Sequence, residues 1–177
     1  MAIAKGRLEP LGVRILEVDE SGELPFVDGA FDAVLNRHSA FRATEVFRIM
    51  KAGGAFLTQQ VGGGNLNDLL KEFDATPQDK DWTLGTATKQ IRDAGFSIKE
   101  AEEWTGKVEF KDVGAIVYFL KAIPWVVQDF SVDNNHHHLE RLQRKIDRGE
   151  KLTFTQVRFL VWANKSGGGL GSGAGKY

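Results

Sequence analysis

The sequence predicts an α/β fold built around a mostly parallel sheet. Two apolar runs of buried-strand type, residues 31–35 (FDAVL) and 55–61 (AFLTQQV), flank a short helical segment. Such short connections from strand to helix to strand are typical of a parallel βαβ crossover. Helical and strand-like segments continue to alternate as far as residue 165. A chain of 177 residues has room for one domain with a single sizeable core.

Composition excludes several classes of protein. The net charge of −1 gives no overall sign of binding to nucleic acid or membrane. The absence of cysteine excludes disulfide frameworks, thiolate metal sites and cysteine nucleophiles. The N-terminal residues lack the apolar core of a signal peptide, and no apolar run is long enough to span a bilayer. A cytoplasmic location is therefore the expectation.

The first 30 residues predict the end of a helix, a strand and a loop. Residues 3–11 place four apolar side chains at helical spacing, which Pro10 and Gly12 interrupt. Residues 13–18 (VRILEV) form a β-branched run, so a strand is expected there. Residues 19–29 (DESGELPFVDG) are rich in turn-forming residues and should be a loop.

Residues 31–61 predict the central crossover. Residues 31–35 are a buried strand, and residues 44–50 form a short helix with most of its apolar residues directed inward. Residues 52–54 (AGG) supply a permissive backbone for a helix stop and a sharp turn. Residues 55–61 then form the second strand.

The second half of the chain predicts four helices and two strands. Asn65 or Asn67 would cap the first helix, and the second would end at Gly95. Residues 96–104 predict a strand, and the strand could continue to residue 110. Two further helices would end at Pro124 and Gly149. The following list gives the apolar residues of the four helices: Leu66, Leu69, Leu70 and Phe73; Leu84, Ala87, Ile91 and Ala94; Val113, Ile116, Val117, Leu120 and Ile123; Val132, Leu139, Leu142 and Ile146.

The C-terminal region ends in a strand and a low-complexity tail. Residues 153–163 (TFTQVRFLVWA) are rich in β-branched and aromatic residues and predict the last strand. Residues 166–177 are rich in glycine and serine, which predicts a flexible tail.

Residues 24–61 resemble the middle of a class I S-adenosylmethionine-dependent methyltransferase. The motifs that carry the resemblance are LPF-x-DG-xFD at 24–32, NRH at 36–38 and K-x-GG at 51–54. The resemblance implies a partial Rossmann-like sheet, mostly parallel with an antiparallel last strand and helices on both faces. It also implies a methyltransferase-like domain over residues 1–165, with a helical insertion at about 107–150 that covers the substrate.

The resemblance has one serious departure at its N-terminal side. The family's first strand, with its glycine-rich E/D-x-G-x-G-x-G loop, has no counterpart in the 23 residues before Leu24. The domain is therefore expected to be truncated, lacking the unit that cradles the cofactor. S-adenosylmethionine is the cofactor that the resemblance implies, and this chain alone would keep only half of its pocket. Whether the truncation is natural stays open.

The resemblance also implies cofactor-binding residues. Asp19 or Glu20 would hydrogen-bond the adenine amino group, and Leu24 would lie close by. Asn36 and Arg37, at the end of the central strand, would face the methionine end of the cofactor. For Asp19 and Glu20 the alternative is a solvated acidic loop. For Arg37 and His38 the alternative is that they are polar residues that close a loop.

Substrate-binding residues are expected at neighbouring positions. His38 is the candidate catalytic residue, because a neutral imidazole could accept a proton from the nucleophile being methylated. Gln59 and Gln60 end the next strand, and their amides need partners, either substrate atoms or neighbouring backbone. Tyr118 and Trp125 belong to an aromatic segment, with Phe119 and Phe130, that could line a substrate pocket or pack in the core.

Two further motifs are expected to carry no chemistry. Residues 62–64 (GGG) lack the lysine and spacing of a phosphate-binding loop, so a flexible connection is expected. The three histidines 136–138 cannot share an ion easily on one helix, so a solvated helical face is expected and no metal site.

Two functions and one assembly follow from the sequence. The first function is methyl transfer to a small molecule or nucleobase; the alternative is a catalytically silent binding or assembly module.

Removal of the family's first strands would leave residues 31–35 at an exposed edge. Phe31, Ala33 and Leu35 would seek burial on one face and Val34 on the other. A homodimer through this edge, or by exchange of the N-terminal segment, is expected; pairing of residues 13–18 with this edge within one chain is the alternative.

Overall fold

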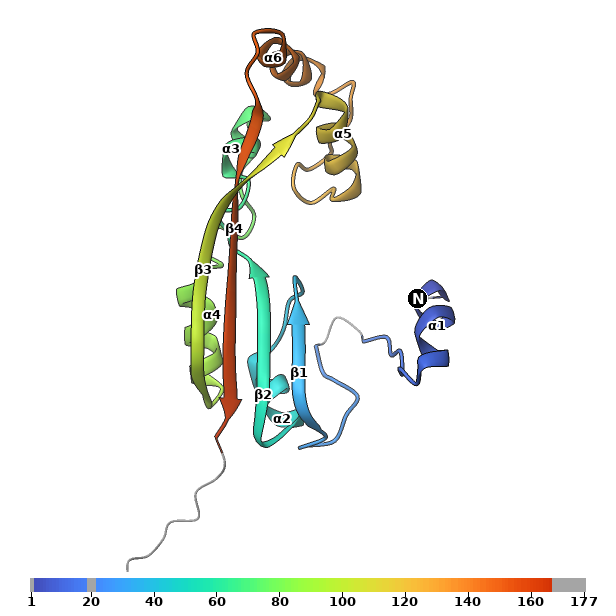
Figure 1. Ribbon diagram of the computed structural model, residues 1–177, viewed down its shortest axis with the longest axis vertical. Helices are drawn as coiled ribbons and strands as arrows, with labels where there is room; N and C mark the ends of the chain where they lie inside the picture. Colours follow the sequence, from blue (N-terminus) through green and yellow to red (C-terminus); the bar gives the residue numbers. More distant parts are fainter. Residues whose placement is uncertain (1, 19–21, 167–177) are drawn as a thin grey trace, which may run out of the picture.

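The computed structural model describes residues 2–18 and 22–166, which build one four-stranded sheet (Figure 1). The strands are β1 (Phe31–Arg37), β2 (Met50–Val61), β3 (Phe96–Phe110) and β4 (Leu152–Lys165), in the order β1-β2-β4-β3. β1 and β2 are parallel, and β4 is antiparallel to both β2 and β3. Three strands therefore share one direction and the last runs against them, which confirms the predicted fold class.

Helices pack on both faces of this sheet. α2 (Ala43–Ile49) and α4 (Leu84–Asp93) cover the face that carries Val34, Phe56 and Ala163. α3 (Asn67–Glu72), α5 (Val113–Ala122) and α6 (His136–Asp147) pack around the far end of β3 and β4, against a second apolar cluster that includes Leu152 and Phe154. Alternate strand residues point to opposite faces, so these two clusters lie on opposite sides of β4.

The β3–β4 pair extends beyond the rest of the sheet. β2 pairs with β4 only between Arg158 and Asn164, whereas β3 remains paired with β4 as far as Leu152. The free end of this two-stranded ribbon carries α5 and α6 (Figure 1). The chain between residues 110 and 152 is thus attached to the sheet through a ribbon rather than a full-width sheet.

The N-terminal segment differs from the prediction. α1 (Ala2–Leu8) and the 3-10 turn η1 (Glu9–Leu11) form the expected helix end, closed by Gly12 at φ 79°. α1 has no buried residue and stands apart from the sheet (Figure 1). Residues 13–18 form no strand, so the predicted strand is wrong there. A β-branched run becomes a strand only beside a partner, and β1 pairs with β2 alone among the described strands.

Two local predictions are also wrong. β2 begins at Met50, directly after α2, so residues 52–54 lie within the strand rather than in a turn. Gly53 has φ 81°, near a break in the β1–β2 register between Phe31 and Ala33. Neither Asn65 nor Asn67 caps α3; the cap position is Leu66, at φ 57°. The Asn65 side chain accepts hydrogen bonds from β4 instead.

The other predicted elements are confirmed, including the extension of the third strand to Phe110. Burial on β1 differs from the expectation, however. Val34 packs on the α2–α4 face, but Leu35 on the other face is 78% exposed. Trp162 aligns with Leu35 through Leu57 and is also exposed, as is Trp104, which lies on the same face farther along β3. No described helix is long and apolar enough to cross a membrane. Of the predicted tail at 166–177, residues 167–177 lie outside the described residues.

Candidate functional site

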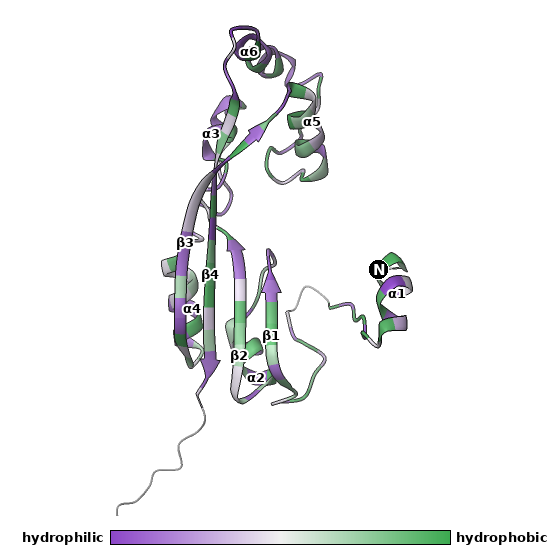
Figure 2. Cartoon of the chain, in the orientation of Figure 1, coloured by the Kyte–Doolittle hydropathy of each residue, from purple (hydrophilic) through white to green (hydrophobic). Residues whose placement is uncertain are grey.

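A cavity of about 770 Å³ opens where β1 and β2 end. This is the position at which α/β sheets present side chains to ligands, beyond the carboxyl ends of parallel strands. Figure 2 shows both strand tips as hydrophilic, above apolar strand centres. The far wall consists of α5 and the segment that follows it. The residues most relevant to chemistry in the lining are His38, Phe41, Gln60, Asp79, Trp82, Phe110, Phe119, Trp125 and Arg158.

Behind the strand tips lies a cluster of three polar side chains: Thr58 and Gln60 are buried, and Asn36 is half-buried. Asn36 Oδ1 accepts hydrogen bonds from Thr58 Oγ1 at 2.9 Å and from Gln60 Nε2 at 2.5 Å. Gln60 Nε2 also contacts Thr58 Oγ1 and the carbonyl oxygen of Ser39. The partners of the Gln60 amide nitrogen are therefore neighbouring protein groups. No described donor reaches Gln60 Oε1, which leaves this oxygen as an acceptor at the cavity wall.

Arg37 and Gln59 lie on the other face of the strands. Arg37 Nε donates to Gln59 Oε1 at 3.2 Å, and the two residues are paired in the β1–β2 register. Neither lines the cavity. Gln59 and Gln60, both candidate substrate-binding residues, are thus not brought together, because consecutive strand residues point to opposite faces.

His38 occupies the turn directly after β1. Its φ is 52°, a left-handed conformation uncommon for a residue with a side chain, and its backbone N–H donates to the Gln59 carbonyl at 2.8 Å. Burial and the positive charges of Arg158 and Arg37 lower the pKa of His38 below its ordinary value. At neutral pH the imidazole is therefore uncharged, the form that can accept a proton.

Arg158 is a site residue that the sequence analysis missed. It lies on β4 opposite Val61, and its Nη1 donates to Asn65 Oδ1 at 2.5 Å and to the Val157 carbonyl at 2.8 Å. Burial lowers its pKa. One signal was present in the sequence: Arg158 is the single charged residue in the apolar run at 153–163.

The aromatic residues divide between cavity and surface. Phe119 and Trp125 line the cavity, which agrees with the pocket alternative for both. Tyr118 does not line it and is 78% exposed, so the structure does not bring this candidate substrate-binding residue to the cavity. The buried side of α5 is set by Ile116 and Leu120, and Tyr118 falls on the opposite side of the helix.

The predicted cofactor residues on the loop before β1 are only partly visible. Asp19 and Glu20 lie outside the described residues. The Leu24 backbone is held by α2: its N–H donates to Glu45 at 2.9 Å, and its carbonyl accepts from Arg48 at 3.0 Å. Arg48 also donates to the Phe26 carbonyl at 2.7 Å. Hydrogen bonds from Arg48 and from the Leu24 backbone lower the pKa of Glu45 to about 2. Leu24 does not line the cavity.

The glycine run and the histidine run have structural roles. A Cβ on Gly63 would overlap the backbone carbonyl oxygens of Asp79 and Lys80, so residues 62–64 pack tightly against the next loop rather than forming a loose connection. His138 is buried, with its ring on Phe73 and its Nδ1 3.0 Å from Arg141, so a solvated face is wrong for this residue. No group of three potential metal ligands occurs among residues 2–18 and 22–166.

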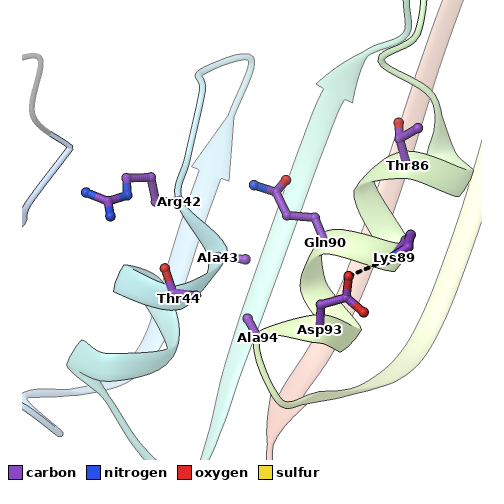
Figure 3. Close-up of a pocket in the computed structure, with 8 residues that line it drawn as sticks. All are labelled: Arg42, Ala43, Thr44, Thr86, Lys89, Gln90, Asp93 and Ala94. Carbon is purple, nitrogen blue, oxygen red and sulfur yellow. Dashed lines mark hydrogen bonds and ion pairs between the residues drawn. The ribbon is translucent and has the colours of Figure 1, made fainter.

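A second hollow of about 410 Å³ lies between α2 and α4 (Figure 3). Its rim carries an ion pair between Lys89 and Asp93 at 2.5 Å, and both side chains are exposed. The hollow contains neither the strand tips nor aromatic side chains. It therefore lacks the polar and apolar combination that the first cavity offers to a ligand.

No protein-family model and no curated protein sequence matches the chain. Solved structures do match it in fold. A candidate methyltransferase from Bacillus halodurans aligns with a TM-score of 0.60 and 18% identity, over 93% of this chain and 78% of that one. The YcgJ protein from Bacillus subtilis aligns with a TM-score of 0.56 and 17% identity, over 94% and 78%. The chain has a methyltransferase-like fold.

The same fold also supports other chemistry. The cyclase SpnF aligns with a TM-score of 0.51 and 17% identity, over 94% of this chain and 63% of that one. The shared fold thus confirms the resemblance that the sequence predicts, while the reaction has to be argued from the residues of the site.

The described residues provide an incomplete fit for S-adenosylmethionine. The acceptor of Asn36 is occupied within the protein, Arg37 points away from the cavity and the Leu24 backbone is bound to α2. Beside β1, no second strand and no glycine-rich loop lies among the described residues. The described residues thus leave most of the contacts that the resemblance implies for the cofactor without a suitable group.

Proposed function

We propose that this chain provides the substrate-binding part of an S-adenosylmethionine-dependent methyltransferase that acts on a small molecule or nucleobase. The observation that carries the proposal is the aromatic cavity at the strand tips, with neutral His38 in its wall. A cavity of 300–1,000 Å³ suits a small ligand. The methyltransferase-like fold supports the assignment of the cofactor class.

In this proposal His38 accepts the proton that the methyl acceptor loses. Its left-handed backbone holds the side chain at the end of β1, and its lowered pKa keeps it unprotonated. His38→Ala should therefore lower turnover more than it weakens binding of the cofactor product, S-adenosylhomocysteine. Turnover and S-adenosylhomocysteine binding would be measured in a protein that also carries the glycine-rich cofactor-binding unit. Unchanged turnover would remove His38 from the proposed role.

A second candidate function is a catalytically silent binding or assembly module. The incomplete cofactor side next to β1 favours it. Isothermal titration with S-adenosylhomocysteine tests the chain itself: micromolar binding supports the enzyme, whereas absence of binding agrees with both candidates. Detectable methyl transfer by the purified chain to any acceptor would eliminate the second candidate.

We also propose that two copies associate through the outer edge of β1. This edge has no partner strand among the described residues, and unpaired backbone groups favour pairing with another chain. Exposed Leu35 beside it adds apolar surface. The N-terminal helix α1, which buries no residue, is available for exchange between copies.

A further inference from the structure

Arg158 is a half-buried cation without a counter-ion. Its Nη1 donates to two neutral oxygens, those of Asn65 and Val157, and it forms no ion pair with a described carboxylate. No described acceptor lies on its Nε or Nη2. Partial desolvation of a cation is costly unless an anion compensates it, so this position favours an anionic ligand.

Two other partly buried cations of the described chain pair with carboxylates, whereas Lys165 donates to the carbonyl oxygens of Phe47 and Met50 and lies over the Phe47 ring. Arg48, with a side chain 31% exposed, forms ion pairs with Asp28 and Glu45. Lys145, with a side chain 29% exposed, pairs with Glu72. The sequence thus supplies carboxylates for Arg48 and Lys145 but not for Arg158, and Arg158, unlike Lys165, lines the cavity.

The surroundings of Arg158 add positive charge. Arg158 and His38 both line the cavity, and Arg37, which lies outside the lining, also acts electrostatically on His38 and adds positive charge near the strand tips. Asp79 is the acid of the described lining, and it is exposed at the rim, where water screens it. The inner part of the cavity is therefore suited to an anionic group.

The remaining wall is suited to a flat apolar body. Phe41 and Trp82 form one aromatic pair, with ring centroids 6.0 Å apart. Phe110 and Phe119 form another at 5.3 Å, on the side of the ribbon, and Trp125 follows. Aromatic side chains from two separate apolar clusters thus enclose the same space.

We propose that the cavity binds a small planar aromatic carboxylate, with its carboxylate on Arg158 and its ring among Trp82, Phe119 and Trp125. Nε and Nη2 of an arginine carry the parallel N–H pair that matches two carboxylate oxygens. Gln60 Oε1 and His38 are left to accept hydrogen bonds from a hydroxyl or amino substituent. The proposal rests on the proposed function, because it names the substrate class of the same site.

The test compares an acid with its neutral analogue in the absence of any cofactor. Isothermal titration of the full chain with 2-naphthoate and with 2-naphthamide, at constant low ionic strength, should give at least tenfold tighter binding of the acid. Arg158→Met should bring the two affinities together while leaving that of the amide unchanged. Arg92→Met, an exposed arginine outside the cavity, is the matched control and should behave as the wild type.

Three results would overturn the proposal: equal binding of acid and amide by the wild type, no binding of the acid at millimolar concentration, or an acid preference that survives Arg158→Met. Inorganic phosphate that competes with the acid more strongly than benzoate does would also contradict a carboxylate site. If Arg158→Met does not fold, the affinities of the acid and the amide for the wild type and for Arg158→Gln decide whether the preference depends on Arg158. An acid preference without methyl transfer in a completed protein would refute the proposed function and leave this inference intact.

Discussion

Replacing Leu120 with alanine tests whether α5 is anchored on the ribbon as the structure shows. Leu120 is fully buried and belongs to the apolar cluster that joins α3, α5 and α6 to β3 and β4. Its neighbours Ile116 and Leu142 are also fully buried and come from two different helices. A site enclosed in this way collapses poorly, so most of the cavity left by the truncation should remain.

The expected cost follows from that burial. A fully buried leucine replaced by alanine typically loses about 3 kcal/mol of stability. For a domain of this length that corresponds to a fall in Tm of roughly 6–12 °C. Tyr118→Ala on the same helix is the matched control, because Tyr118 is 78% exposed and a surface change typically costs at most ~0.5 kcal/mol.

Urea unfolding monitored by tryptophan fluorescence measures both variants. Trp125 lies just after α5 and reports on this region. The prediction is a clear loss for Leu120→Ala and almost none for Tyr118→Ala. Equal losses for the two variants would refute the packing of α5, and with it the position of Phe119 and Trp125 in the cavity wall.

Three further outcomes are expected. The folded-state pKa of Glu45, about 2 against 4.5 unperturbed, means that its stabilising contribution is complete above pH 4.5 and lost as pH falls toward 2; Glu45→Gln, which weakens the contact with Arg48, should flatten this part of a stability–pH curve, and an unchanged curve would argue against the contact. Thr58→Val removes two buried hydrogen bonds, one of them with Gln60, and should cost about 1–3 kcal/mol in urea unfolding; unchanged stability would contradict the cluster. Light scattering at micromolar concentration should find a dimer that Leu35→Lys dissociates, whereas a wild-type monomer would defeat the assembly proposal.

The fold was largely predictable because its signals are local. Residues 31–61 combine two apolar runs with a short helix, and β1, α2 and β2 follow them closely. Residues 13–18 carry the same kind of signal but form no strand, because strand formation depends on a partner that lies elsewhere in the chain. The helical pattern of α5 was correct, yet it could not assign Tyr118 to the surface before the side of the helix that faces the ribbon was known.

The candidate site was less predictable because it joins distant positions. His38 and Gln60 could be placed at strand tips from their position after apolar runs. Arg158 approaches them only through the antiparallel return of β4, which brings it opposite Val61. Its missing counter-ion is a property of three-dimensional surroundings, and no spacing within the sequence contains that information.

The narrow ribbon has a consequence for how the molecule opens. Apart from the two connections that lead into and out of α3, only β3 and β4 join the apolar cluster under α5 and α6 to the one beneath α2 and α4 in the described chain, so the two clusters should unfold as separate cooperative units. Amide hydrogen exchange would then show two protection levels along β4, with the change near Arg158. A ligand in the cavity touches Trp82 on one unit and Phe119 on the other. Bound ligand should therefore slow amide exchange in both units together, because it contacts both units and couples their opening.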